Sequence, residues 1–233
     1  MFAARPQSRT YRLIATLLDY PHKGLLDALP DARGMVRCER AFSTDIRAKL
    51  ERFLDYLGRH DLLTLQENYV ALFDRGRATS LHLFEHVHGE SRERGQAMID
   101  LMQMYERHRL YLAPGQLPDY LPVFLEYLSI LEANEARTLL GETAAILQSI
   151  TAELSRRNSH YAYAIGALLP FAGAQDTALP DAAHDDDANT PHDDRALHAL
   201  DAAYAEEPVR FVGAAQPAVA PVEFHRQRAP RRA

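Results

Sequence analysis

Apolar residues recur three and four positions apart through most of the chain, from about residue 8 to residue 170. Alternating runs of β-branched residues, which would indicate strands, are almost absent from this region. The spacing therefore predicts an all-α domain. Its clearest apolar stripes are Tyr11, Ile14, Leu17 and Leu18, then Ile46, Leu50, Phe53, Leu54 and Leu57, then Leu65, Tyr69, Leu72 and Phe73, then Met98, Leu101, Met102 and Tyr105, then Leu121, Phe124, Leu125 and Leu128.

Turn and capping residues set the expected helix boundaries. Pro21 ends the first helix, because proline has no N–H to donate and restricts the residue before it. Ser43 and Asp61 are placed to cap the next two helices, and Gly58 is placed to end the first of these. The remaining pattern predicts a short helix that begins at 79 or 80 and ends near 89, followed by a helix from about 90 to about 108. Further along, it predicts a helix that begins near 119, a long helix from 134 to 156 and a last segment over 161–169.

The character of the chain changes after Pro170. Residues 171–233 are rich in proline and poor in large apolar residues, with an acidic middle part and a basic end. Such segments cannot bury enough apolar surface to offset the entropy of ordering. The sequence therefore predicts one helical-bundle domain over 8–170 and a mostly disordered tail, in which a short helix near 195–205 could form.

Composition narrows the classes of function. The formal net charge is −6, which argues against nonspecific nucleic-acid binding, because that requires clustered Lys and Arg. Cys38 is the single cysteine, so the chain can form no internal disulfide, and we expect a cytoplasmic protein. The apolar run over 13–18 is far shorter than the roughly 20 residues that span a bilayer, so we expect no stable membrane insertion.

The best chemical motif in the sequence is H-x-x-E-H, formed by His82, Glu85 and His86. Residues in this pattern bind zinc and activate water in one class of metalloprotease, because two histidines four positions apart share a helix face. A catalytic zinc site needs a third protein ligand, and nothing distinguishes Glu126, Glu132 or Glu135 for that role. Either the segment belongs to a zinc-dependent hydrolase, or its histidines form hydrogen bonds at a helix edge or line a groove.

Other catalytic motifs are missing from the sequence. There is no G-x-S-x-G elbow and no glycine-rich loop that could hold a phosphate. Met98, Met102 and Met104 are either core residues or, where exposed, part of an adaptable groove for an apolar helix. We therefore expect a binding protein that needs no cofactor.

Three stretches together resemble the NarJ-type nitrate reductase molybdenum cofactor assembly chaperones, also called the nitrate reductase delta subunit. They are LLDYP at 17–21, TSLHLFEHVHGESRERGQAM at 79–98 and LPDYLPVFLEYL at 117–128. A patch at 205–209 is also similar, and the resemblance covers about 11–211. Related chaperones carry a P-x-D-H-type motif here; Pro118 and Asp119 match it, and Tyr120 stands at the usual histidine position.

The resemblance implies an all-helical redox-enzyme maturation chaperone without catalytic activity, acting in nitrate assimilation. Such a chaperone binds the N-terminal segment of the catalytic alpha subunit of nitrate reductase. It keeps the apoenzyme competent for molybdenum cofactor insertion before membrane attachment, and cofactor-delivery proteins are further partners. An interaction domain with another client protein is the remaining alternative.

Motif position and residue type predict a groove that takes an amphipathic helix, with apolar anchors inside and acidic residues at the rim. Histidines at the groove would make binding change between about pH 6 and 8, around the ordinary imidazole pKa. The predicted peptide-binding residues are Tyr69, Phe73, His82, His86, Glu90, Met98, Asp119, Tyr120, Phe124, Glu126 and Tyr127.

Overall fold

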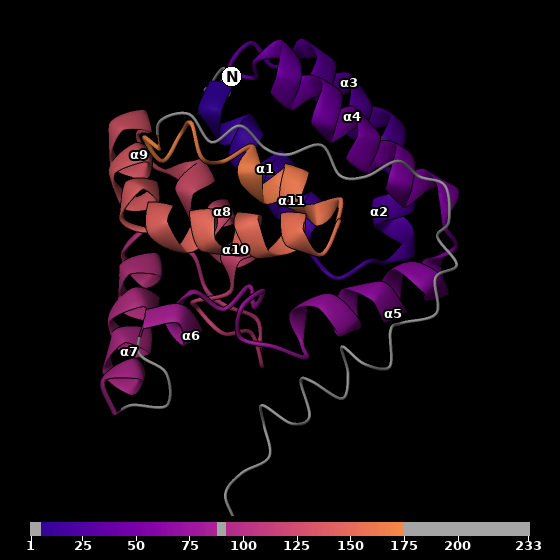
Figure 1. Cartoon of the computed structure of the whole chain (residues 1–233). Helices are drawn as coiled ribbons and strands as arrows, with labels where there is room; N and C mark the ends of the chain where they lie inside the picture. The colour runs from indigo at the N-terminus through magenta and orange to yellow at the C-terminus, as the bar shows by residue number, and fades with distance from the viewer. Residues whose placement is uncertain (1–5, 88–91, 175–233) are drawn as a thin grey trace, which may run out of the picture. The chain divides into compact units, whose positions relative to one another are not determined.

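Helices account for nearly all regular structure in the computed structural model, which describes residues 6–87 and 92–174 (Figure 1). The helices are α1 (Pro6–Leu18), α2 (Lys23–Asp27), α3 (Leu29–Cys38), α4 (Thr44–Arg59), α5 (Leu62–Phe73), α6 (Leu83–Val87), α7 (Arg92–Arg107), α8 (Leu121–Ile130), α9 (Ala133–Glu142), α10 (Ala144–Arg156) and α11 (Tyr161–Gly166). Within the described ranges, the only β feature is one isolated antiparallel bridge between His82 and Tyr120. The prediction of an all-α fold is confirmed.

The core is built around α1 and α8, which pack closely against each other along their lengths. α8 is buried on nearly every side because its sequence, LPVFLEYLSI, is apolar almost throughout. Such a helix belongs inside a bundle, since the burial of apolar side chains on all its faces stabilises the folded state. α11 packs against α1, and α4 and α10 pack against α11. Figure 1 shows α5, α6 and α7 on the opposite side from α3 and α4.

Two predicted caps are confirmed at atomic detail. The Ser43 hydroxyl oxygen accepts from the Ile46 backbone N–H at 3.2 Å, and an Asp61 carboxylate oxygen accepts from the Thr64 N–H at 3.0 Å. Each bond satisfies a donor that the first helical turn leaves unpaired. The predicted stop at Gly58 is wrong, because α4 continues to Arg59 and ends where the backbone becomes extended at His60.

The region 23–38 contains two helices, α2 and α3, that the sequence pattern did not predict. α3 buries only one narrow face, through Leu29, Ala32 and Val36, and glycine and proline interrupt the pattern. The N-cap of α2 is His22, whose Nδ1 accepts from the Leu25 N–H at 3.2 Å. Histidine is not among the usual capping residues, so nothing local marked this start.

The predicted long helix over 134–156 is two helices that meet at Thr143. There the Thr143 N–H bonds three residues back instead of four, and both this N–H and the Thr143 hydroxyl donate to the Leu140 carbonyl, at 3.0 and 2.8 Å. A threonine hydroxyl that competes for the backbone in this way favours a turn over a continuing helix. The apolar spacing runs on across the break, which is why periodicity alone suggested one helix.

Packing continues slightly past the predicted domain boundary at residue 170. Phe171 is buried, and its ring meets Tyr11 and Phe42 edge-on with centroids 6.1 and 6.2 Å apart. The predicted tail helix near 195–205 lies outside the described residues. None of the helices in the described ranges combines the length and the apolar character needed to cross a membrane.

The burial pattern predicts unequal costs for one substitution made at two helical sites. Leu125→Ala on α8 removes a fully buried side chain and leaves a cavity, so we expect a loss of about 2–5 kcal/mol in the free energy of unfolding. Leu63→Ala on α5 is the matched control, since that side chain is 64% exposed and its loss should cost about 0.5 kcal/mol or less. Urea unfolding measures both, and equal losses would contradict the packing described.

Candidate functional site

The loop before α6 and the loop before α8 lie side by side. The Leu83 N–H donates to the Asp119 carbonyl at 2.9 Å, and the Leu121 N–H donates to the Leu81 carbonyl at 2.8 Å. These bonds flank the bridge between His82 and Tyr120 and hold the two loops antiparallel. Each helix therefore starts directly from the crossing.

The predicted start of the short helix at Thr79 or Ser80 is wrong, since α6 begins at Leu83. Both hydroxyl side chains serve the preceding loop instead. Thr79 is buried and its hydroxyl donates to the Leu72 carbonyl, while the Ser80 hydroxyl oxygen accepts from the His82 N–H at 3.2 Å. The same residue types that cap helices also stabilise turns, so the sequence could not separate the two roles.

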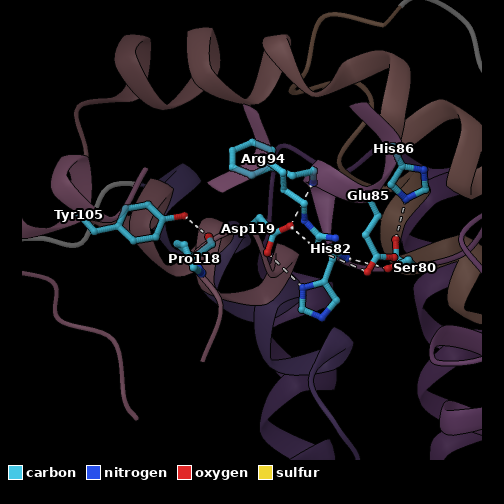
Figure 2. A network of polar contacts seen from close by, with 9 residues as sticks. Ser80, His82, Glu85, His86, Arg94, Tyr105, Pro118 and Asp119 are labelled. Carbon is cyan, nitrogen blue, oxygen red and sulfur yellow. Dashed lines mark hydrogen bonds and ion pairs between the residues drawn. The ribbon is translucent and has the colours of Figure 1, made fainter. Parts of the chain in front are cut away.

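Asp119 is the centre of the crossing, and its side chain is completely buried. Its two carboxylate oxygens accept separately from the His82 Nδ1–H and the Phe84 backbone N–H, each at 3.2 Å (Figure 2). The Arg94 guanidinium lies 3.9 Å from the second oxygen and 3.6 Å from a Glu85 carboxylate oxygen. A buried charge is tolerated only with such partners.

His82 takes its charge state from this carboxylate. The hydrogen bond to Asp119 raises the pKa of His82, and burial lowers it. The negative charges of Asp119 and Glu85 raise this pKa further, while the positive charge of Arg94 lowers it. The net direction is upward, so the imidazolium form is favoured beside Asp119.

His86 points to a different acceptor than His82. Its Nε2–H donates to the Ser80 carbonyl at 2.9 Å, while the His82 ring turns toward Asp119 (Figure 2). Since α6 starts at Leu83, the two histidines do not share a helix face in the way the zinc motif requires. Among residues 6–87 and 92–174, no three His, Cys, Asp or Glu side chains come together as candidate metal ligands.

Tyr120 links this crossing to the end of α1. Its hydroxyl lies 2.7 Å from the Tyr69 hydroxyl and 3.4 Å from an Asp19 carboxylate oxygen, and the Tyr69 hydroxyl donates to the Leu18 carbonyl at 2.8 Å. Burial raises the pKa of both Tyr69 and Tyr120 well above the ordinary value for tyrosine. Both hydroxyls are therefore neutral and act as hydrogen-bonding groups.

The three stretches that carry the family resemblance meet at this place. Asp19 belongs to 17–21, His82 to 79–98, and Asp119 and Tyr120 to 117–128, and the contacts above join all three. Residues that are about a hundred positions apart thus form one local cluster.

The predicted peptide-binding residues divide by burial. Asp119, predicted at an acidic rim, is fully buried, and its partners lie inside the protein, on the loop before α6, on α6 and on α7. The buried aromatic residues are Tyr69, Phe73, Phe124 and Tyr127; the partly exposed residues are His82, His86, Met98 and Tyr120; Glu126 is exposed. Glu90 lies outside the described residues.

These residues do not all line one surface. The structure brings together Tyr69, His82, Asp119 and Tyr120. The Tyr127 hydroxyl instead bonds to His108 Nδ1 at 3.1 Å.

Sequence reasoning missed two members of the cluster. Arg94 was not among the predicted site residues, yet its guanidinium lies 3.9 Å from an Asp119 carboxylate oxygen. Asp19 received no role, yet its carboxylate lies beside Tyr120. Both lie within the stretches of resemblance, which is the only signal that pointed to them.

Comparison with known proteins finds relatives that match most of the chain. The chain is 42% identical over 85% of its length to NarJ of Escherichia coli strain K12, a nitrate reductase molybdenum cofactor assembly chaperone, and spans 83% of that protein. It is 39% identical to NarW of the same strain, over 86% of this chain and 83% of the relative. These relatives are named as chaperones and not as catalytic enzymes, so the zinc hydrolase alternative has no support from them.

The fold has a solved counterpart. The crystal structure of an Archaeoglobus fulgidus protein described as a redox enzyme maturation protein superposes with a TM-score of 0.53 at 20% identity, covering 73% of this chain and 96% of that one. At this identity the likeness concerns the fold alone. The sequence profile described as nitrate reductase delta subunit matches residues 39–165. With that match and the identity to NarJ, the chain belongs to the nitrate reductase delta subunit family.

Proposed function

We propose that this protein is an assembly chaperone for respiratory nitrate reductase that binds the N-terminal segment of the catalytic alpha subunit. It keeps the apoenzyme competent for molybdenum cofactor insertion before membrane attachment, acting in the cytoplasm together with cofactor-delivery proteins. The proposed chaperone domain is the helical unit over about 8–170, continued to Phe171, and the rest is a tail. The observation that carries the proposal is the convergence of the three family stretches on Tyr120.

The surface around this convergence suits an amphipathic segment. Each of the three stretches leaves a large apolar side chain exposed: Tyr20, Val87 and Leu117. Half-exposed Tyr120 and His82 lie between the elements that carry these side chains, with their rings 5.4 Å apart. Exposed apolar groups beside fixed polar ones are typical of protein interaction sites.

The buried part of the cluster supports the site from within. The rings of Tyr69 and Phe73 are 4.6 Å apart beneath Tyr20, whose ring meets Tyr69 edge-on at 5.5 Å. Rigid side chains lose little conformational freedom on binding, so a packed aromatic base favours affinity. Two predicted groove residues, Tyr69 and Phe73, would thus act on a bound segment through Tyr20, whose ring they support.

The proposal predicts capture of the alpha subunit through its N-terminus. Tagged protein should retain alpha subunit from cells that lack the cofactor-synthesis pathway, because the apoenzyme is the chaperone's client. An alpha subunit without its N-terminal segment is the control and should be lost from the eluate, as immunoblotting would measure. Equal recovery of the two forms would contradict the assigned binding segment.

Tyr120 is expected to contribute directly to that binding. Tyr120→Ala removes a central aromatic side chain and should weaken affinity for the N-terminal peptide about tenfold in calorimetry. Tyr111→Ala is the matched control, since Tyr111 is 72% exposed in the loop between α7 and α8. Circular dichroism checks that both variants are folded, and identical affinities for the two would remove Tyr120 from the interface.

The raised pKa of His82 predicts how stability depends on pH. The stabilisation from protonated His82 beside Asp119 is complete below the ordinary histidine pKa of about 6.5 and is lost as pH rises through the higher pKa of the folded state. His82→Asn should therefore cost more unfolding free energy at pH 6 than at pH 8.5, by on the order of 1 kcal/mol.

His86→Asn is the control for this measurement, because His86 donates to an uncharged carbonyl. Chemical unfolding across this pH range would give the cost of each substitution. A His82→Asn cost that stays constant with pH would show that the His82 and Asp119 pair does not carry the charge described.

A further inference from the structure

Helix α7 is attached to the rest of the described structure through few side chains. Among the α7 side chains that the structure describes, Leu101 and Tyr105 alone are buried, whereas α8 buries eight of its ten residues. Ile99 and Met102 are 44% and 40% exposed on the outer side of α7. An element with few buried apolar contacts opens at a lower free energy than the core of the same domain.

The contacts that hold α7 in place fall on the loop before α8 and on α8 itself. The Tyr105 hydroxyl donates to the Pro118 carbonyl at 2.7 Å, and within the described residues no other α7 side chain forms a hydrogen bond to another element. The centroid of the Tyr105 ring lies 4.6 Å from that of the Tyr127 ring. The Arg94 guanidinium lies 3.9 Å from Asp119, which is longer than a hydrogen bond (Figure 2). The hydrogen bonding of α7 to its neighbours therefore depends on one hydroxyl.

The groups that α7 covers have the chemistry of a peptide-binding surface. Tyr127 and Asp119 are completely buried while α7 is in place, although residue type and motif position predicted both at the groove. Detachment of α7 uncovers the Tyr127 ring, frees the Pro118 carbonyl and removes Arg94 from Asp119. An aromatic face, a free acceptor and a carboxylate with fewer partners then extend the surface that begins at Tyr120.

We propose that α7 is a latch that opens to admit the N-terminal segment of the alpha subunit. In the closed form α7 covers Tyr127 and the loop before α8, and in the open form the segment packs against the uncovered surface. This inference rests on the proposed function and adds to it a conformational step that regulates the same site. The full surface exists only in the open form, so the apparent dissociation constant falls as the open fraction rises. A change that weakens the latch therefore tightens binding.

Hydrogen exchange of the whole chain, followed by mass spectrometry, tests the opening. A helix of 16 residues is marginal in water once it has left its packing site, so its amides exchange. The α7 amides should exchange faster than the α8 amides, and their rate should depend less on added urea, because local opening exposes less surface than unfolding of the domain. Tyr105→Phe removes the hydroxyl bonded to Pro118 and should raise α7 exchange about fivefold.

Calorimetry with a synthetic peptide of the alpha-subunit N-terminal segment tests what the opening does. Tyr105→Phe should bind this peptide about fivefold more tightly than the wild type, whereas loss of a merely structural contact would weaken binding or leave it unchanged. Tyr161→Phe is the matched control and should bind as the wild type does. The same substitution there removes a buried hydroxyl that has no hydrogen-bond partner in the described part of the chain.

Two results would overturn the latch. One is exchange of α7 and α8 at the same rate with the same urea dependence, because α7 would then open only when the domain unfolds. The other is peptide affinity that stays unchanged or falls in Tyr105→Phe. A wild-type protein that binds no peptide overturns the proposed function instead, and hydrogen exchange then decides by itself whether α7 opens.

Discussion

The buried carboxylate of Asp119 fixes the relative positions of the elements around the candidate site. Removing a charge from water is costly, and only nearby donors and opposite charges offset that cost. Asp119 finds them in the His82 ring, the Phe84 N–H and the Arg94 guanidinium, which lie on the segment around α6 and on α7. The start of α8 is thereby tied to α6 and α7, and any element that moved away would leave the buried charge with fewer partners.

This constraint also explains the H-x-x-E-H segment. His82 donates to Asp119, Glu85 lies near Arg94, and His86 donates to the Ser80 carbonyl. Each member of the motif is thus used in holding the loop crossing together. The spacing required for a zinc ligand pair is present in the sequence, but its helical geometry is not, because the bridge between His82 and Tyr120 keeps His82 outside α6.

Local chemistry predicted most of the fold. The stripes of α1, α4, α5 and α8 and the caps at Ser43 and Asp61 depend on neighbouring residues, so the sequence contained enough to find them. The break at Thr143 is hidden from periodicity, because the apolar spacing continues across it, and α3 was missed because it buries only one narrow face. Of the predicted site, Tyr69, His82, Asp119 and Tyr120 do come together, while Tyr127 lies in another contact.

Burial is the property that residue type predicted least well at this site. Asp119 was expected at a rim because carboxylates are rarely buried, and its donors lie at residues 82, 84 and 94, too far along the chain for spacing to reveal. Asp19 has the opposite character, since it is exposed and lacks a cationic partner in the described residues. Two aspartates in the same cluster thus differ in environment: Asp119 is buried and holds the loops together, whereas Asp19 faces solvent and accepts from the Tyr120 hydroxyl at 3.4 Å.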